Sequence, residues 1–254
     1  MPDRQPRHRT QRRHRHPGAP AAHDERFVRP GGASRDLAVT PAFLGVLMLQ
    51  TRFPRLPGDV GHAASFRMAV RHRVVAGATP GRVVREQDPA LLRPFIEAAQ
   101  ALIADGASAI TTSCGFLVQH QEALQAALPV PVWTSALLKL PELSKPGVLT
   151  VAARSLGVDL LRAAGAAPGT PVQGLPEGGH LQRTLLDDLP TLDPARAEAE
   201  VVAASCALVQ RHPDIDSVVL ECTNLPPYAE AIGHATGRPV HHLMTLVHER
   251  WTSR

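Results

Sequence analysis

The chain has 254 residues, of which 44% are hydrophobic and 20% are charged, and its formal net charge is +4. This length and composition are typical of a globular protein that buries a sizeable core. The sequence has no apolar stretch of the roughly 20 residues that a membrane span needs. We expect no secretory signal, because residues 1–36 lack the apolar segment of one. Its three cysteines are far apart and predict no disulfide framework, so we expect a reducing, cytoplasmic location.

The positive charge belongs to the N-terminal tail. Residues 1–36 carry nine arginines against four acidic residues, a net charge of +5, whereas the rest of the chain carries 18 Lys and Arg against 19 Asp and Glu. Because the tail has no hydrophobic period, we expect it to be disordered. A basic tail is able to touch nucleic acid or an anionic surface, but the body is close to neutral, and we assign the tail no nucleic-acid function.

From residue 37 onward, apolar strands alternate with amphipathic helices. Strands are expected at 43–49, 73–78, 107–112, 130–134, 147–152, 217–222 and 238–242. Helices are expected at 89–106, 115–128, 135–143, 153–165, 194–212 and 225–235, with a last helix ending at 251, and loops at 50–61 and 175–182. This alternation predicts an α/β fold with parallel sheets flanked by helices.

The sequence contains an internal repeat. Shifting it by 108 positions aligns Cys114 with Cys222 and produces eight identities over the 25 positions from 114 to 138. The repeat predicts two similar lobes related by a pseudo-two-fold, with the active site in the cleft between them. We place lobe one at residues 37–142 and 236–254, and lobe two at residues 143–235.

Both cysteines fall where a strand ends and a helix begins. Ligands bind at the carboxyl ends of the strands in such sheets, and a helix N-terminus lowers a thiol pKa towards neutrality. One thiolate can then remove a proton from a substrate carbon while the other thiol returns a proton to the opposite face, which inverts the carbon. Groups near Cys114 and Cys222 that can hold a carboxylate are Thr112, Ser113, Gly115, Thr223 and Asn224.

Other residues are candidates for the cleft because they follow predicted strands. These are Gln50, Arg52, Thr134 and Ser135. The sequence has no nucleotide-binding glycine motif. It also has no zinc-hydrolase histidine pair, so we predict no metal. Of its two lysines, Lys139 would be the candidate tether for pyridoxal phosphate, but we predict that the protein uses no cofactor.

The segments TTSCG (111–115), LECTNLP (220–226) and the Pro-Val strand after each resemble the aspartate/glutamate/hydantoin racemase superfamily, over roughly residues 43–251. The opening GVLMLQTRFPRLPGDVG is similar to an uncharacterised branch of that superfamily. The resemblance implies a cofactor-independent enzyme of two α/β lobes that uses Cys114 and Cys222 as a proton relay, with Thr223 after the second cysteine. It also implies a homodimer. Glutamate and aspartate racemases carry Asn-Thr after the first cysteine, where this chain has Gly115-Phe116.

We therefore predict an isomerase: a racemase or epimerase that inverts a carbon next to a carboxylate or carbonyl in a small acid. Two alternatives stay open. One is a cis–trans isomerase or decarboxylase of a small dicarboxylate on the same scaffold. The other is a non-catalytic protein that binds a small molecule. In each case the expected partner is a small carboxylate-bearing molecule, with no membrane involved.

Overall fold

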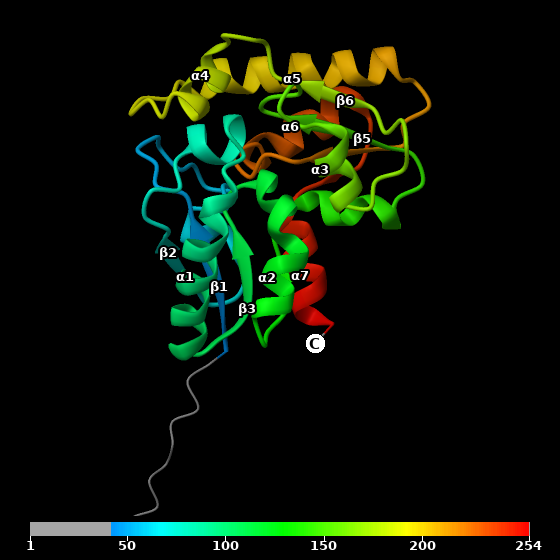
Figure 1. Cartoon of the computed structure of the whole chain (residues 1–254). Coiled ribbons are helices and arrows are strands. Elements are labelled where there is room, and N and C mark those ends of the chain that lie inside the picture. The colour runs from blue at the N-terminus through cyan, green and yellow to red at the C-terminus, as the bar shows by residue number, and fades with distance from the viewer. Residues whose placement is uncertain (1–41, 254) are drawn as a thin grey trace, which may run out of the picture. The chain divides into compact units, whose positions relative to one another are not determined.

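The computed structural model describes residues 42–253, so the predicted disordered tail lies outside the described residues. Two parallel four-stranded sheets organise the fold (Figure 1). The first has the order β2-β1-β3-β4 and is formed by β1 (Phe43–Met48), β2 (Val70–Val74), β3 (Ala107–Thr112) and β4 (Val132–Trp133). The second has the order β6-β5-β7-β8 and is formed by β5 (Pro146–Thr150), β6 (Val172–Gly174), β7 (Ser217–Leu220) and β8 (Val240–His241).

Helices flank both sheets, as an α/β fold requires. They are α1 (Leu92–Ala104), α2 (Gln121–Ala127), α3 (Val158–Ala163), α4 (His180–Leu186), α5 (Pro194–Arg211), α6 (Ala229–Thr236) and α7 (Leu243–Thr252). The long helix α5 begins where the Asp193 carboxylate accepts hydrogen bonds from the backbone of Ala195 and Arg196, with Pro194 at its first position. This is the side-chain cap that the sequence DPAR specifies.

The internal repeat is present in the pairing of the strands. In the first sheet Ile110 pairs with Val132, and in the second sheet Val218 pairs with Val240, so both partners are displaced by 108 positions. The helices that follow, α2 and α6, begin at Gln121 and Ala229, again 108 residues apart. The predicted fold class, two similar lobes of parallel sheet flanked by helices, is therefore confirmed.

The structure differs from the predicted elements in several places. Strand β2 begins three residues earlier than predicted, because Val70–Val74 is the segment that pairs in register with Leu44–Met48. Strand β8 pairs with β7 in the second sheet, although the sequence placed it in lobe one. Helix α4 begins inside the segment predicted as a loop, and β6 had not been predicted; both are too short to give a clear hydrophobic period.

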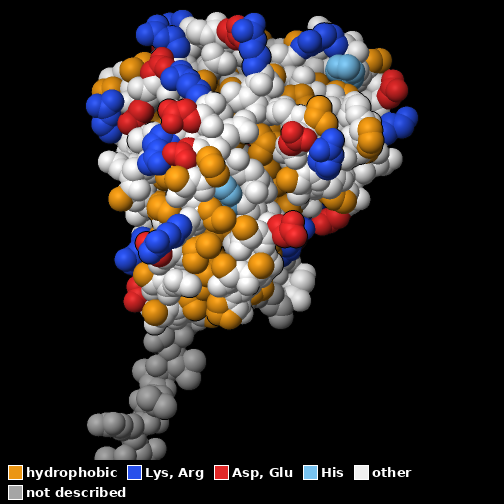
Figure 2. All heavy atoms as spheres, viewed as in Figure 1, with side chains coloured by type: hydrophobic (Ala, Val, Ile, Leu, Met, Phe, Trp, Pro, Cys, Tyr) orange, Lys and Arg blue, Asp and Glu red, His pale blue; other side chains and the backbone are white. Residues whose placement is uncertain are grey.

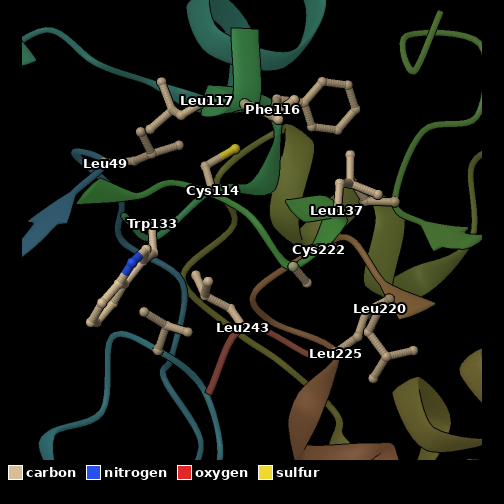
Figure 3. Close-up of a cluster of buried hydrophobic side chains, with 14 of the residues drawn as sticks. Leu49, Cys114, Phe116, Leu117, Trp133, Leu137, Leu220, Cys222, Leu225 and Leu243 are labelled. Carbon is tan, nitrogen blue, oxygen red and sulfur yellow. The ribbon is translucent and has the colours of Figure 1, made fainter. Parts of the chain in front are cut away.

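One continuous apolar core joins the two lobes. Buried side chains from both sheets and from the helices around them belong to a single cluster, part of which is drawn in Figure 3. Charged side chains of both signs lie on the outer surface (Figure 2), where pairs such as Arg154–Glu177 and Arg162–Asp159 are largely exposed. Between residues 42 and 253 no helix is long and apolar enough to cross a membrane.

Candidate active site

The turns that follow β3 and β7 bring Cys114 and Cys222 to one cavity. It has a volume of about 30 Å³, which is close to the space that one water molecule occupies. Both lobes line it, and most of the lining is apolar: Leu49, Phe53, Pro80, Val84, Val151, Leu185 and Leu186. Its polar lining is Ser113, Glu221, Thr223 and Asn224, with the two thiols and Gly115. Figure 3 shows the two cysteines among the apolar side chains that surround them.

Both thiols are buried, with 8% of Cys114 and 6% of Cys222 exposed. Burial, followed by the negative charge of a Glu221 carboxylate, raises the pKa of each thiol above its ordinary value. The expected fall towards neutrality is thus not what the structure shows, because burial outweighs the helix terminus. A backbone N–H favours each thiolate, that of Phe116 at Cys114 and that of Asn224 at Cys222. The two sites differ in their charges: Arg55 favours the Cys114 thiolate, whereas Cys114 and Asp59 disfavour the Cys222 thiolate.

Glu221 is the ionisable side chain of this cavity that the sequence analysis missed. It is fully buried, and its Oε2 accepts a hydrogen bond of 2.7 Å from the Thr150 hydroxyl. Its Oε1 has no hydrogen-bond partner among the described residues. Burial raises the pKa of the Glu221 carboxyl to about 8. The carboxyl is therefore mostly protonated at neutral pH in the empty cavity.

Gly115 lies directly against Glu221. A Cβ atom at position 115 would collide with the backbone carbonyl and with Oε1 of Glu221. This contact is a physical reason why this chain has glycine where glutamate and aspartate racemases have asparagine. The space that a side chain at position 115 would need is filled here by Glu221 from the other lobe.

A loop of lobe one supports the second cysteine. Asp59, which is 3% exposed, accepts hydrogen bonds from Arg55 at 3.0 Å and from Asn224 Nδ2 at 2.5 Å. The Asn224 side-chain oxygen in turn faces the sulfur of Cys222 at 3.6 Å. The backbone N–H of Val60 also donates to the Thr223 carbonyl. Asp59 thus fixes the orientation of the amide that contacts Cys222.

Four of the predicted substrate contacts line the cavity: Ser113, Gly115, Thr223 and Asn224. Ser113 Oγ accepts a hydrogen bond of 2.9 Å from the backbone of Leu49 and retains its own proton for donation. The Thr223 hydroxyl donates to the Ser113 carbonyl at 2.6 Å. It therefore ties the two cysteine turns together.

The other predicted contacts do not line this cavity, and the structure engages them elsewhere. The Thr112 hydroxyl donates to the Thr134 carbonyl, and the Thr134 hydroxyl donates to Gln121. Ser135 caps the 3-10 helix Ala136–Glu142. Gln50 accepts a hydrogen bond from the backbone N–H of Gly77.

Arg52 joins the two lobes at the margin of the cavity. It binds Asp188 through its backbone N–H at 2.6 Å and through its guanidinium at 3.1 Å, and it also donates to the Asp188 carbonyl. The Arg85 guanidinium likewise donates a hydrogen bond of 2.6 Å to the Asp187 carboxylate. These aspartates follow helix α4, whose Leu185 and Leu186 line the cavity. The two ion pairs therefore hold α4 over the thiols.

Lys139, the candidate cofactor tether, is engaged away from this site. Its ammonium binds Glu142 at 2.8 Å and Glu249 at 2.6 Å, and these two carboxylates raise its pKa. It is not among the residues that line the cavity. Its role in the structure is to attach helix α7 to the 3-10 helix Ala136–Glu142.

Comparison with known proteins relates this chain to one group of enzymes by its sequence and to another by its fold. No family model matches the chain. The dimethylsulfoniopropionate lyase of Durusdinium sp. clade D is 30% identical over 249 residues, which cover 88% of this chain and 78% of that protein. The chain belongs to the family of this lyase. Dimethylsulfoniopropionate lyase 5 of Emiliania huxleyi is also 30% identical, over 82% of this chain, but the chain spans only 44% of that longer protein.

The fold of this lyase family member is that of the aspartate/glutamate/hydantoin racemase superfamily, which confirms the resemblance at the level of the fold. Allantoin racemase of Pseudomonas fluorescens superposes with a TM-score of 0.54 at 18% identity, covering 80% of this chain and 86% of that one. A putative Asp/Glu racemase of Yersinia pestis gives 0.52 at 13% identity over 80% and 94% of the two chains. A cysteine-for-glycine mutant of arylmalonate decarboxylase gives 0.52 at 16% identity over 78% and 86%.

Proposed function

We propose that this protein is a lyase that cleaves dimethylsulfoniopropionate to dimethyl sulfide and acrylate. The observation that carries the proposal is the 30% identity, over 88% of the chain, to a curated lyase for this substrate. We propose this elimination in place of the expected racemisation, and the two reactions begin with the same step. Both reactions remove a proton from the carbon next to a carboxylate.

The reaction requires one base and no external electron carrier. A base takes the proton from the α-carbon, and the electron pair of that C–H bond forms the new C=C bond. The bond between the β-carbon and sulfur breaks, and its electron pair leaves with sulfur as neutral dimethyl sulfide. The positive charge of the sulfonium is lost with the leaving group, so the products are dimethyl sulfide, acrylate and one proton.

We assign the base to Cys114. The charge of Arg55 favours its thiolate, whereas Cys114 and Asp59 make the surroundings of Cys222 more negative. Ser113, which lines the cavity and keeps a hydroxyl proton to donate, is suited to bind the substrate carboxylate and to stabilise charge that develops there. Cys222 also lines the cavity, but the elimination needs no second proton transfer, so we assign it no proton to donate.

The asymmetry of the cavity supports an elimination over an inversion. The 108-residue repeat aligns Ser113 with Glu221, the residues directly before the two cysteines. Their backbone N–H groups make equivalent hydrogen bonds to the carbonyls of Leu47 and Leu149. One side of the cavity thus carries a hydroxyl and the other a carboxyl. A racemase exchanges protons on two equivalent faces of its substrate, and that reaction does not require a hydroxyl on one side and a carboxyl on the other.

The test is an activity assay on the wild-type protein and on Cys114→Ser and Cys222→Ser. Dimethyl sulfide is measured in the headspace, and acrylate is measured in solution by NMR. We expect equal amounts of both products from the wild type, a loss of at least about a hundredfold for Cys114→Ser, and a smaller loss for Cys222→Ser. Absence of both products from a folded wild-type protein would refute the proposal.

A second candidate function is racemisation or decarboxylation of a small acid. It is favoured by the presence of both thiols at one cavity in a fold shared with allantoin racemase and arylmalonate decarboxylase. Incubation with single-enantiomer amino acids, hydantoins and malonates in deuterated water tests it. Exchange of the α-hydrogen with inversion supports a racemase, and loss of carbon dioxide supports a decarboxylase. Retention of ligand binding without any turnover would support the non-catalytic alternative.

A further inference from the structure

The role of Glu221 is not explained by the proton transfer assigned to Cys114. Its side chain is fully buried, one of its oxygens is bonded to Thr150, and the other faces no hydrogen-bond donor among the described residues. A buried carboxyl that lacks a donor or a cation is costly to maintain. Such a group in a cavity is explained when a ligand supplies the missing partner.

The charged and titratable groups around Glu221 leave this partner unassigned. The two thiols come from the turns after β3 and β7, and the negative charge of Glu221 raises the pKa of both. The cation near the site, Arg55, is already bonded to Asp59 and Thr51 and lies 4.4 Å from the centre of the Phe53 ring. Between residues 42 and 253, no Lys, Arg or His forms an ion pair with Glu221.

The remaining lining of the cavity defines the kind of cation that fits. Leucine, valine, proline and phenylalanine side chains make up half of the lining residues, and these side chains offer no acceptors for the N–H groups of an ammonium ion. A sulfonium ion has no N–H groups. It presents a positive sulfur surrounded by methyl groups, which bury well against such side chains.

We propose that Glu221 is the residue that binds the sulfonium group and selects cationic over neutral substrates. This proposal rests on the proposed function and deepens it. Binding places a positive charge beside the carboxylate, which ionises and becomes the counter-ion of the sulfonium. That pairing also cancels the negative charge that raises the pKa of both thiols. The substrate thus favours the thiolate that its own cleavage requires.

The first experiment compares two ligands of the same shape. Dimethylsulfoniopropionate and 4-methylpentanoate differ chiefly in that a neutral CH replaces the positive sulfur. Their binding is measured by calorimetry in the Cys114→Ser background, which prevents turnover, with and without Glu221→Gln. We expect Glu221→Gln to weaken binding of the sulfonium about tenfold or more, and to change binding of 4-methylpentanoate by less than about threefold. Equal effects on both ligands would overturn the proposal.

Thr150→Val is the matched control. It removes the hydrogen bond to Glu221 Oε2 and leaves the carboxyl in the cavity. If charge is what selects the ligand, the preference for the sulfonium over 4-methylpentanoate is retained in Thr150→Val. If that preference is lost to the same extent as in Glu221→Gln, the effect is one of packing and the proposal fails.

A second measurement needs no substitution at Glu221. The pKa of this carboxyl is about 8 in the empty cavity, and the neighbouring thiols titrate above that range. At pH 7 the sulfonium must therefore displace up to about one proton, and at pH 9 almost none. Calorimetry in buffers of different ionisation enthalpy counts these protons. Proton release with the sulfonium but not with 4-methylpentanoate is expected; equal release with both would contradict the proposal.

The outcomes separate this proposal from the proposed function. If the wild type cleaves dimethylsulfoniopropionate but Glu221→Gln binds it equally well, the lyase stands and the role of Glu221 is wrong. If the protein binds the sulfonium through Glu221 but never cleaves it, the binding role stands and the lyase is wrong. If it neither binds nor cleaves the sulfonium, both are wrong.

Discussion

At the scale of single residues, the cysteines could be predicted from the sequence and Glu221 could not. The repeat pairs identical residues, so it identified Cys114 and Cys222, but it aligns Glu221 with a serine and gave no signal there. A weaker indication lay outside the repeat: Glu221 directly follows the three apolar strand residues Val218, Val219 and Leu220, where burial is expected. The departure at Gly115 was visible in the sequence, yet its cause, contact with Glu221, depends on how the two lobes pack.

The contact between Gly115 and Glu221 predicts the effect of a single methyl group. Gly115→Ala would push the carboxyl and its backbone aside, and we expect it to destabilise the fold by about 1–3 kcal/mol and to abolish most activity. Gly157→Ala is the control, since nothing lies within 4 Å of its added methyl group. Urea denaturation and product assays on both variants check this. Equal behaviour of the two would show that the close contact is unimportant.

The raised pKa of Glu221 predicts a pH-dependent difference in stability. The carboxyl titrates at about 8 in the folded protein, against an ordinary value of 4.5. The folded state therefore binds the proton more tightly than the unfolded state does. The stability that the protonated carboxyl contributes is fully present below pH 4.5 and is lost as the pH rises through 8. Relative to wild type, Glu221→Gln should gain stability by up to about 1.4 kcal/mol per pH unit between these limits. Denaturation at pH 5.5, 6.5 and 7.5 measures this; a difference that does not change with pH would contradict it.

At the scale of elements, helix α4 decides access to the cavity. The cavity is partly open and has a volume of only about 30 Å³, so we expect part of the lining to move when a substrate enters. Helix α4 contributes two leucines to the lining and is held to lobe one by two partly exposed ion pairs. Exposed ion pairs contribute little to stability. The start of this helix was predicted as a loop, because its seven residues are too few to show a hydrophobic period.

Weakening one of these ion pairs is therefore expected to loosen α4 alone. Arg52→Ala removes the guanidinium contacts with Asp188 and should change global stability by less than about 1 kcal/mol. Hydrogen exchange of the amides at 180–189 should accelerate, while exchange elsewhere is unchanged. Arg93→Ala, which removes an exposed pair on α1, is the control and should leave these amides unaffected. Unchanged exchange at 180–189 in Arg52→Ala would show that α4 is held by its leucines.

At the scale of the whole molecule, the structure confirms the architecture that the sequence predicted, and the reaction remains a proposal. Strand and helix periods and the 108-residue repeat predicted two similar α/β lobes, and the register of both sheets follows that repeat. The chemistry was predicted as an inversion because two similar turns suggest two equivalent faces. The difference between the faces depends on side chains brought together from both lobes, Ser113 from one and Glu221 from the other, which a local pattern does not reveal.

The most direct test of the lyase proposal is one NMR time course in deuterated water. Wild-type protein is given dimethylsulfoniopropionate together with single-enantiomer amino acids and hydantoins, so that elimination and inversion compete in the same tube. We predict that acrylate and dimethyl sulfide appear in equal amounts while the α-hydrogens of the other compounds stay unexchanged. Exchange and inversion of those compounds, with dimethylsulfoniopropionate left intact, would contradict it.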